Sequence, residues 1–268
     1  METLKFQRPD FRRDAHSREY WARINLENRV SAYNAASGGE DGTGIACPDC
    51  NNKGTVAFIS PDSGNFTVRP CKCHGLRTTV KRLQKCGVWQ QAQRYKLNNF
   101  QTDTPTRRTM KAVTKQFLQS HQGHWLMLCG QSGAGKTHLC TAAFVDLIQR
   151  TGLCGEYFLW NRDGRALKAT VLEDPQNLWK RYREAELLYI DDLFQGARSD
   201  ADRRMAFELL DYRYNNDLPT ILSSELSFHE LLRLDQAIAG RIREKCGRFL
   251  VNITPEIRKN YRLEGRER

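Results

Sequence analysis

An eight-residue run, GQSGAGKT at residues 130–137, has residue types that can hold a phosphate chain. It fits the nucleotide-binding pattern G-x-x-x-x-G-K-[ST] in full. Its glycines let the backbone turn so that amide N–H groups face phosphate oxygens. Lys136 adds a cation for the β- and γ-phosphates, and the hydroxyl of Thr137 can ligate Mg²⁺. An apolar strand precedes the run and a helix follows it, so we expect a nucleoside triphosphate site rather than a chance match.

Two adjacent carboxylates follow an apolar run in LLYIDDLF, residues 187–194. A hydrophobic strand that ends in acids is typical of the magnesium side of such a site. We expect Asp191 to hold Mg²⁺, directly or through water, and Asp192 to orient or deprotonate the attacking water. A charged strand end without a metal is the alternative. The residues expected to bind ATP and Mg²⁺ are Gly130, Gln131, Ser132, Gly133, Ala134, Gly135, Lys136, Thr137, His138 and Asp191.

Four of the nine cysteines lie close together in the sequence, in CPDC and, twenty residues later, in CKC. These residues are Cys47, Cys50, Cys71 and Cys73. Two turns can each present two thiolates to one tetrahedral zinc ion, and the apolar runs between them predict a β-hairpin. Because about thirty residues cannot bury enough apolar surface to fold alone, zinc would supply the missing stability. The alternatives are four free thiols, a redox pair at Cys47 and Cys50, or His74 as the fourth ligand in place of Cys73.

The elements that must position these motifs alternate between strands and helices. Expected strands cover WLMLC (125–129), EYFLW (156–160), LLYI (187–190), TILSS (220–224) and FLVNI (249–253), with helices at 136–150 and 203–216. This alternation predicts an α/β fold with a parallel sheet covered by helices on both faces. The expected division is an N-terminal helical arm and linker at 1–44, a zinc-binding hairpin at 45–75, a basic linker helix at 76–100 and an ATPase domain at 101–268.

The composition of the 268 residues, 40% hydrophobic and 27% charged, is that of a globular protein. No run of about 18 apolar residues and no secretory signal is evident, so we expect a cytoplasmic protein with no membrane partner. Residues 76–120 hold ten basic residues and one acidic residue, which gives +9 of the net charge of +11. Such a zone favours single-stranded DNA as a partner, although a solvated surface helix is the alternative. The expected contacts are Lys81, Arg82, Lys85, Trp89, Arg107 and Arg108.

From about residue 98 to residue 253 the chain resembles the DnaC-type helicase-loader ATPases of the AAA+ superfamily. The matching pieces are YKLNNF (95–100), GQSGAGKTHL (130–139), AELLYIDDLF (185–194), PTILSSELS (219–227) and GRIREKCG (240–247). The cysteine hairpin is similar to the zinc-bearing N-terminal regions of some bacterial and phage loaders. The resemblance implies an AAA+ P-loop ATPase with five parallel strands, the glycine loop after the first and the acids after the third. It also implies a small zinc-ribbon-like N-terminal domain ahead of the sheet.

The resemblance further implies a slow, Mg-dependent ATPase that binds ATP between subunits of a ring or spiral. It would place a hexameric, DnaB-like replicative helicase on single-stranded DNA in a bacterial host cell. Arg241 matches the arginine that reaches a neighbour's γ-phosphate, with Arg243 as the alternative and a surface ion pair to Glu244 as the bland reading. Ser224, beside Ser223, ends the fourth strand where a polar sensor residue stands. Loaders commonly have asparagine at the position of Glu225.

Only fifteen residues follow Ile253, so we expect no C-terminal helical lid. Two other functions stay open: a transposition regulator ATPase of the IstB type, and a zinc nucleic-acid-binding adaptor that only senses ATP. The N-terminal residues 1–75, with Tyr20, Trp21 and Leu26, are expected to carry the helicase-binding surface, because interface cores favour aromatic residues over charge.

Overall fold

In the computed structural model, residues 15–85, 89–169, 175–196 and 198–254 are described. The chain forms two compact units, Met1–His74 and Gly75–Arg268. Within the described residues, no helix combines the length and the apolar character needed to cross a membrane. The predicted absence of a C-terminal lid concerns residues after Ile253, and 255–268 lie outside the described part of the chain.

The N-terminal unit combines a long helix, α1 (Ala15–Ala35), with a hairpin of β1 (Thr55–Ile59) and β2 (Phe66–Pro70). The strands pair antiparallel, as predicted from the apolar runs around SPDSG. The amide side chain of Asn34 on α1 extends the pairing of β1, since it accepts from the N–H of Ala57 and donates to the carbonyl of Ala57, both at 2.9 Å. A short 3₁₀ turn, η1 (Pro48–Cys50), precedes the hairpin.

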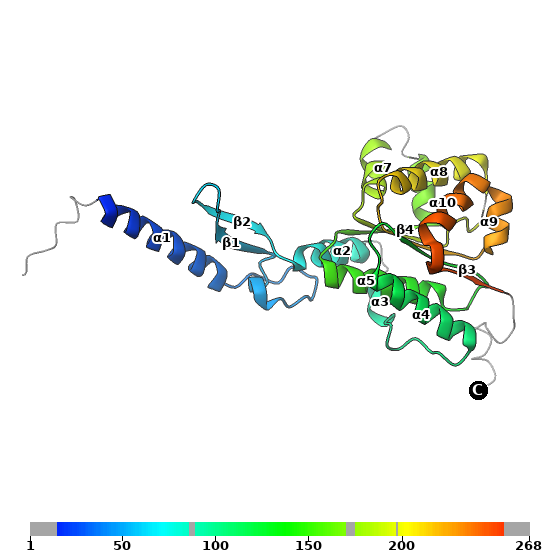
Figure 1. Cartoon of the computed structure of the whole chain (residues 1–268), viewed down its shortest axis with the longest axis horizontal. Helices are drawn as coiled ribbons and strands as arrows, with labels where there is room; N and C mark the ends of the chain where they lie inside the picture. The colour runs from blue at the N-terminus through cyan, green and yellow to red at the C-terminus, as the bar shows by residue number, and fades with distance from the viewer. Residues whose placement is uncertain (1–14, 86–88, 170–174, 197, 255–268) are drawn as a thin grey trace, which may run out of the picture. The chain divides into compact units, whose positions relative to one another are not determined.

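The second unit is built on a parallel sheet (Figure 1). Among the described residues, five strands lie in the order β4-β5-β6-β3-β7. These are β3 (Trp125–Gly130), β4 (Gly155–Leu159), β5 (Leu187–Asp191), β6 (Thr220–Ser224) and β7 (Leu250–Ile253). The predicted α/β class and the five parallel strands are confirmed, with the glycine loop after the first strand of this sheet and the paired acids after the third.

Helices cover both faces of this sheet. One face carries α2 (Cys73–Lys85), α3 (Trp89–Arg94), α4 (Pro105–Gln119) and α5 (Lys136–Thr151). The other carries α6 (Trp160–Ala169), α7 (Pro175–Arg183), α8 (Asp200–Asn215), α9 (Phe228–Leu234) and α10 (Gln236–Cys246), and a 3₁₀ turn, η3 (Gly247–Phe249), leads into β7. Every residue of β3 is buried, as expected for a central strand with both faces covered. Leu126 and Leu128 point to one helical layer, Trp125 and Met127 to the other.

The segment after the cysteines is part of this second unit. Leu83, Ala92 and Phe100 belong to its core. Within the expected basic linker helix at 76–100, the described residues form α2, which ends at Lys85, and α3, which runs from Trp89 to Arg94. The described residues of 76–100, a segment expected as a linker helix, therefore pack against the parallel sheet.

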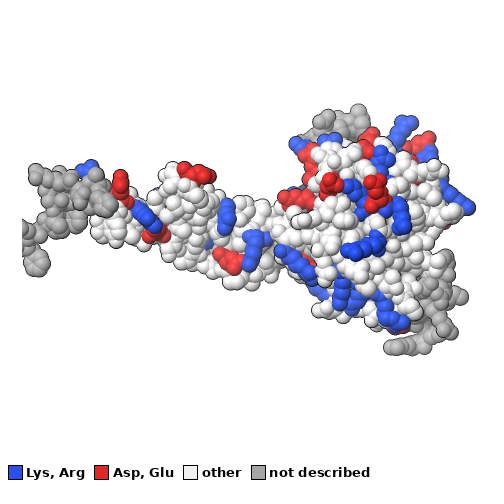
Figure 2. Space-filling model, in the orientation of Figure 1, with Lys and Arg blue, Asp and Glu red and all other residues white. Residues whose placement is uncertain are grey.

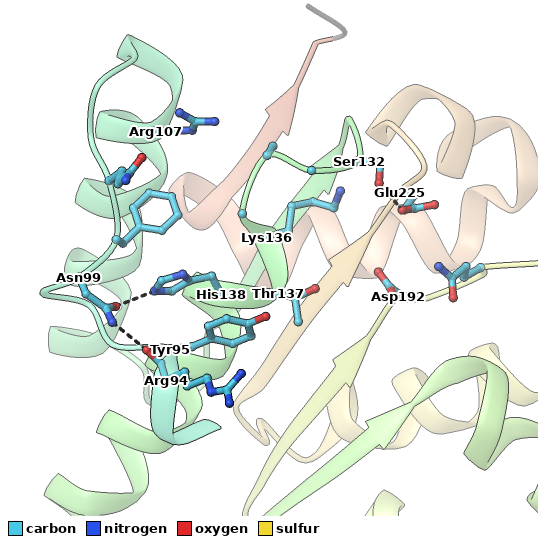
Figure 3. Close-up of a pocket in the computed structure, with 16 residues that line it drawn as sticks. Arg94, Tyr95, Asn99, Arg107, Ser132, Lys136, Thr137, His138, Asp192 and Glu225 are labelled. Carbon is cyan, nitrogen blue, oxygen red and sulfur yellow. Dashed lines mark hydrogen bonds between the residues drawn. The ribbon is translucent and has the colours of Figure 1, made fainter. Parts of the chain in front are cut away.

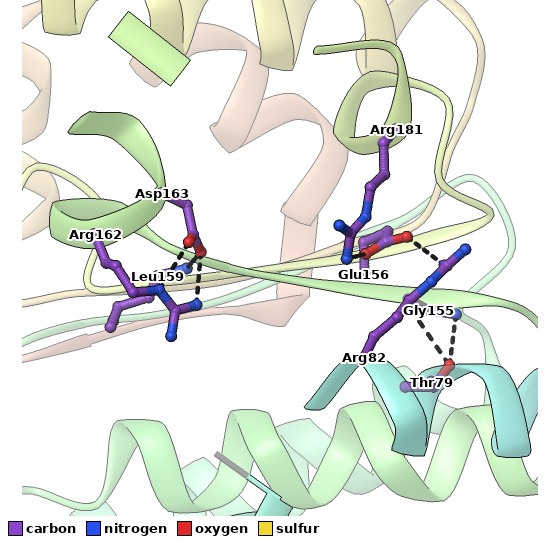
Figure 4. A network of polar contacts seen from close by, with 8 residues as sticks. All are labelled: Thr79, Arg82, Gly155, Glu156, Leu159, Arg162, Asp163 and Arg181. Atoms are coloured by element: carbon purple, nitrogen blue, oxygen red, sulfur yellow. Dashed lines mark hydrogen bonds and ion pairs between the residues drawn. The ribbon is translucent and has the colours of Figure 1, made fainter. Parts of the chain in front are cut away.

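A polar network fixes α2 to the edge strand β4 (Figure 4). The hydroxyl of Thr79 accepts from the N–H of Gly155 at 3.0 Å and faces the carbonyl of the same residue. Glu156, which is 2% exposed, pairs with Arg82 of α2 and, at 2.7 Å, with Arg181 of α7. Because a buried carboxylate is stable only when paired, α2 and α7 are both tied to the start of β4.

Candidate functional site

A cavity of about 550 Å³ lies over the glycine loop at the carboxyl ends of the strands. Parallel sheets place ligand sites at this edge. Its wall contains Ser132, Gly133, Ala134, Gly135, Lys136, Thr137 and His138, all predicted from the sequence. Figure 3 shows this loop between the segment that carries Asn99 and the strand end that carries Asp192. The volume and the row of backbone amides fit a nucleotide with its phosphates on the loop.

Two glycines of the loop stand where another residue would not fit. Gly130 ends β3 with φ +103°, and a Cβ there would lie 2.2 Å from the carbonyl oxygen of Ile253. Gly135 begins α5 with φ +94°, and its Cβ would lie 2.6 Å from the Phe100 ring. Both conformations strain a side chain, so the loop depends on glycine here. The N–H of Gly130 donates to the carbonyl of Leu226 at 2.9 Å, which ties the loop to the segment after β6.

The cation of the loop is enclosed by it. Lys136 is 5% exposed, and its Nζ donates at 2.8 Å to the carbonyls of Gly130 and Gln131. Burial lowers the pKa of Lys136, while the carboxylates of Glu225 and Asp192 act in the opposite direction. The ammonium is thus held in the position where a phosphate chain on the loop would meet a positive charge. Gln131, also predicted, holds Lys136 through this carbonyl and is not among the residues that line the cavity.

The paired acids after β5 occupy different environments. Asp191 is 3% exposed and accepts four hydroxyl groups, from Thr137 at 3.2 Å, Tyr189 at 2.6 Å, Ser223 at 2.5 Å and Tyr157 at 2.9 Å. Burial and this carboxylate both raise the pKa of Tyr157, so the phenol stays a donor. The contact with Thr137 puts the two predicted Mg²⁺ residues side by side.

Asp192, by contrast, lines the cavity. It adopts a left-handed conformation, φ +57°, and its N–H donates to the hydroxyl of Ser223 at 2.9 Å. This turn places the second acid at the cavity near the loop (Figure 3), while the first accepts a hydrogen bond from Thr137. The arrangement is compatible with the predicted roles, in which Asp191 holds Mg²⁺ and Asp192 lies near the attacking water.

The residues expected to act as the polar sensor and as the arginine that reaches a neighbour's γ-phosphate have other partners in this chain. The hydroxyl of Ser224 donates to the carbonyl of Leu193 at 2.7 Å, away from the cavity. Arg241 pairs with Asp211 through Nε at 2.8 Å and Nη2 at 2.6 Å, and lies over the Phe207 ring. Its expected surface partner, Glu244, is therefore the wrong acid. Arg243, the alternative to Arg241 in this role, donates to the carbonyl of Gly247 at 3.2 Å.

His138 supports the cavity wall opposite the acids. Its Nε2 lies 3.0 Å from the carbonyl of Lys96 and from Oδ1 of Asn99, and its ring stacks on Tyr95 at 4.8 Å. Burial lowers the pKa of His138, which favours the neutral ring in this aromatic setting. The predicted ligand thus also orders the segment that closes one side of the site.

Several residues of the cavity were not predicted as site residues: Arg94, Tyr95, Asn99, Phe100, Gln101, Arg107, Gln195 and Glu225. The run YKLNNF was the available signal for three of them, Tyr95, Asn99 and Phe100, since it resembled the loader family without a role attached. Arg107 had been expected to contact DNA. It is instead 2% exposed and pairs with Asp103 at 2.6 Å, which contradicts that assignment.

The other expected DNA contacts divide in the same way. Arg82 pairs with the buried Glu156, Trp89 packs on the core, and Arg108 donates to the carbonyl of Thr102 at 3.0 Å. Lys81 and Lys85 are exposed on α2. On the face shown in Figure 2, basic side chains predominate over the region of α4 and α5 and mix with acidic ones over α7, α8 and α10.

The four cysteines form a compact cluster in the N-terminal unit. All four are buried, and their sulfur atoms lie within 4.8 Å of one another. The Sγ atoms are 3.8 Å apart in the pair Cys47–Cys71 and 3.6 Å apart in Cys50–Cys73. A tetrahedral zinc with Zn–S distances of about 2.3 Å requires sulfur–sulfur edges of about 3.8 Å. The cluster therefore fits zinc, and within the described residues His74 is not part of it.

Comparison with known proteins places the second unit in a family. A model described as "IstB-like ATP binding protein" matches residues 77–252. The Bacillus subtilis (strain 168) "Phage-like element PBSX protein XkdC" is 29% identical over 241 residues, which cover 84% of this chain and 89% of the relative.

Solved structures share the fold. The crystal structure of the DnaC helicase loader has a TM-score of 0.54 and 23% identity, over 58% of this chain and 96% of that one. The replication initiator DnaA bound to AMPPCP and single-stranded DNA has a TM-score of 0.52 and 22% identity, over 61% of this chain and 50% of that one. These likenesses confirm the predicted AAA+ P-loop architecture.

Proposed function

This chain belongs to the family of IstB-like ATP binding proteins, and from that membership and the geometry of the site we propose that it is an ATP-dependent loader of the replicative DNA helicase. The observation that carries the proposal is the cavity over the glycine loop, which the buried Lys136 lines together with the carboxylates of Asp192 and Glu225. The likeness in fold to the DnaC helicase loader and the separate cysteine unit support a loader over other ATPases.

In this proposal ATP lies in the cavity with its phosphates on residues 130–137 and Mg²⁺ beside Thr137 and Asp191. Bound Mg²⁺ would neutralise phosphate charge. Lys136 supplies the protein's own cation, and the hydroxyl groups that donate to Asp191 orient that carboxylate. Asp192 holds or accepts the proton of the attacking water. The segment 94–101 encloses the nucleoside end of the cavity.

Assembly would complete the site. We propose that subunits associate in a ring or spiral, with Arg241 of one chain facing the nucleotide of the next. Its guanidinium would have to exchange Asp211 for a phosphate, a switch that couples assembly to hydrolysis. Hydrolysis by the isolated chain should accordingly be slow.

The N-terminal unit is the proposed helicase-binding part. Tyr20 and Trp21 on α1 are 59% and 50% exposed and contact each other edge to face at 5.6 Å. Exposed aromatic pairs are unusual on a surface that meets only water and are enriched in protein interfaces. A structural zinc on the four cysteines would hold the hairpin beneath this helix, with no open position for chemistry. Exposed lysines of α2, Lys81 and Lys85, are the proposed contacts to single-stranded DNA.

The direct test is retention of the full chain by an immobilised ring-shaped replicative helicase from the bacterial host, with and without ATP. We expect retention that changes with ATP. No retention in either condition contradicts the loader proposal and leaves the ATP site standing.

A transposition regulator of the IstB type is the second candidate, because the family model that matches carries that name. Such regulators usually have a different N-terminal region without zinc. Stimulation by a transposase, with no retention by the helicase, would favour this function. The cysteine cluster is the feature that favours the loader.

A further inference from the structure

The end of β6 is the place where a polar residue would be expected to contact the terminal phosphate, and both serines there are turned inward. Ser223 and Ser224 are fully buried. The hydroxyl of Ser223 donates to Asp191, and that of Ser224 donates to the carbonyl of Leu193 and accepts from the N–H of Leu226 at 3.2 Å. Each hydroxyl is used inside the protein, so the next residue along the chain becomes the candidate.

That next residue, Glu225, is exposed and lines the cavity. Its Oε1 accepts a hydrogen bond from the hydroxyl of Ser132 in the glycine loop at 2.7 Å. It is also the carboxylate with the largest charge effect on Lys136, ahead of Asp192. Figure 3 shows the Glu225 side chain next to Ser132, across the mouth of the loop from Lys136.

The backbone next to Glu225 is held by two hydrogen bonds of Leu226, one of which reaches the loop. The carbonyl of Leu226 accepts from Gly130, and the N–H of Leu226 is held by Ser224. Ser227 then caps α9 through a reciprocal pair of hydrogen bonds with Glu230. These contacts hold the backbone beside Glu225 next to the loop, so the carboxylate leaves Ser132 most simply by rotation of its side chain.

We propose that Glu225 is a specificity-determining residue that discriminates between nucleoside di- and triphosphates; the inference rests on the proposed ATP site. Its carboxylate accepts the hydrogen bond of the Ser132 hydroxyl and interacts with the charge of Lys136. A terminal phosphate would use both of these groups. A triphosphate must displace it and tolerate a like charge nearby, whereas a diphosphate leaves the Glu225–Ser132 contact intact. The chain should consequently bind ATP more weakly, relative to ADP, than it would with a neutral residue at this position.

The test is a pair of dissociation constants, for ATP and for ADP with Mg²⁺, measured by calorimetry on the full chain and on Glu225→Gln. We expect ATP affinity to rise about tenfold or more and ADP affinity to change less than about threefold, since removal of one charge acts mainly on the nearest phosphate. Glu208→Gln, which removes an exposed carboxylate of α8 outside the cavity, is the matched control and should change neither constant.

Equal changes for ATP and ADP, or no change, overturn the role of Glu225 while the ATP site stands. Retained ADP binding by the variant shows that it is folded. If the unaltered chain binds neither nucleotide, the proposed site itself is wrong and the inference falls with it.

Discussion

The two acids after β5 lie in different environments, because Asp191 is buried and Asp192 lines the cavity. Asp191 is enclosed by hydroxyl donors, which hold its carboxylate in a fixed position. Only the second acid is therefore placed to exchange a proton with a water molecule near the nucleotide.

Replacing Asp192 with asparagine should preserve ATP binding and lower the single-turnover hydrolysis rate. Asparagine tolerates the left-handed backbone at this position, so the turn should survive. A loss of about 10²–10⁴-fold is expected for a general base. Asp146→Asn, on the outer surface of α5, is the control. Hydrolysis at the unaltered rate would remove Asp192 from the base role.

Among single residues, the sequence predicted those that belong to short motifs for binding phosphate and Mg²⁺. Lys136, Thr137 and Asp191 belong to short motifs, and all three converge. Glu225 and Arg107 could not be predicted as cavity residues, because they are common residue types brought to the loop by strand order and helix packing.

One element-level contact holds the second helical layer together. Arg213 of α8 is fully buried and donates to the carbonyls of Tyr182, Arg183, Ala185 and Pro219 and to the hydroxyl of Thr220. Its planar fork thus joins α8 to the end of α7 and the start of β6, which a lysine with three donors could not match.

Arg213→Leu should therefore destabilise the ATPase unit by at least about 3 kcal/mol, because each buried carbonyl left without a donor costs about 1–3 kcal/mol. Arg204→Leu, on the exposed side of the same helix, should change stability by less than about 0.5 kcal/mol. Thermal or urea unfolding of both variants measures the difference. Similar midpoints for the two would mean that the buried contacts contribute little.

The cysteine hairpin yields a second prediction for an element. Cys50→Ser should abolish zinc binding, measured by elemental analysis, and unfold the hairpin while ATP binding persists, because the two units are separately compact. Cys154→Ser, outside the cluster, should keep about one zinc per chain. A zinc content near zero in unaltered protein that never met a chelator would contradict the metal site.

Element boundaries show why sequence patterns alone were imperfect. Trp160 was expected to end a strand but begins α6, because the carboxylate of Asp163 accepts from the N–H of Leu159 at 2.8 Å and turns the chain there. The apolar run itself carries no trace of that contact. The identity of β3 to β7 as strands of a parallel sheet followed from the alternation of apolar runs and helices, which is set by burial on both faces, whereas their order in the sheet was not predicted.

In the whole molecule, part of the positive charge of residues 76–120 is neutralised by ion pairs within the chain. Arg82 and Arg107 serve buried contacts, so net charge overstated the surface open to DNA. Figure 2 still shows a predominance of basic side chains over the region of α4 and α5. Charge counted along a sequence cannot distinguish the two uses, because pairing depends on strands and helices distant in the chain.

The aromatic pair of α1 should anchor the partner. Tyr20→Ala combined with Trp21→Ala is expected to weaken helicase binding by at least about tenfold. Aromatic residues that dominate an interface contribute about 2 kcal/mol or more, which corresponds to more than tenfold in the dissociation constant. ATP affinity should not change. Leu232→Ala removes an exposed apolar side chain of the other unit and is the control. Unaltered helicase binding by the double variant would exclude this surface.

The central claim is that ATP held by the glycine loop drives helicase loading. The most direct measurement is the amount of helicase transferred to closed circular single-stranded DNA with ATP, by the unaltered chain and by Lys136→Ala. Loss of the buried ammonium removes the cation for the phosphates, so the variant should load less than about one tenth as much helicase. Lys115→Ala, on the exposed side of α4, should load normally. Equal loading by Lys136→Ala, or no loading above helicase alone by the unaltered chain, would contradict the claim.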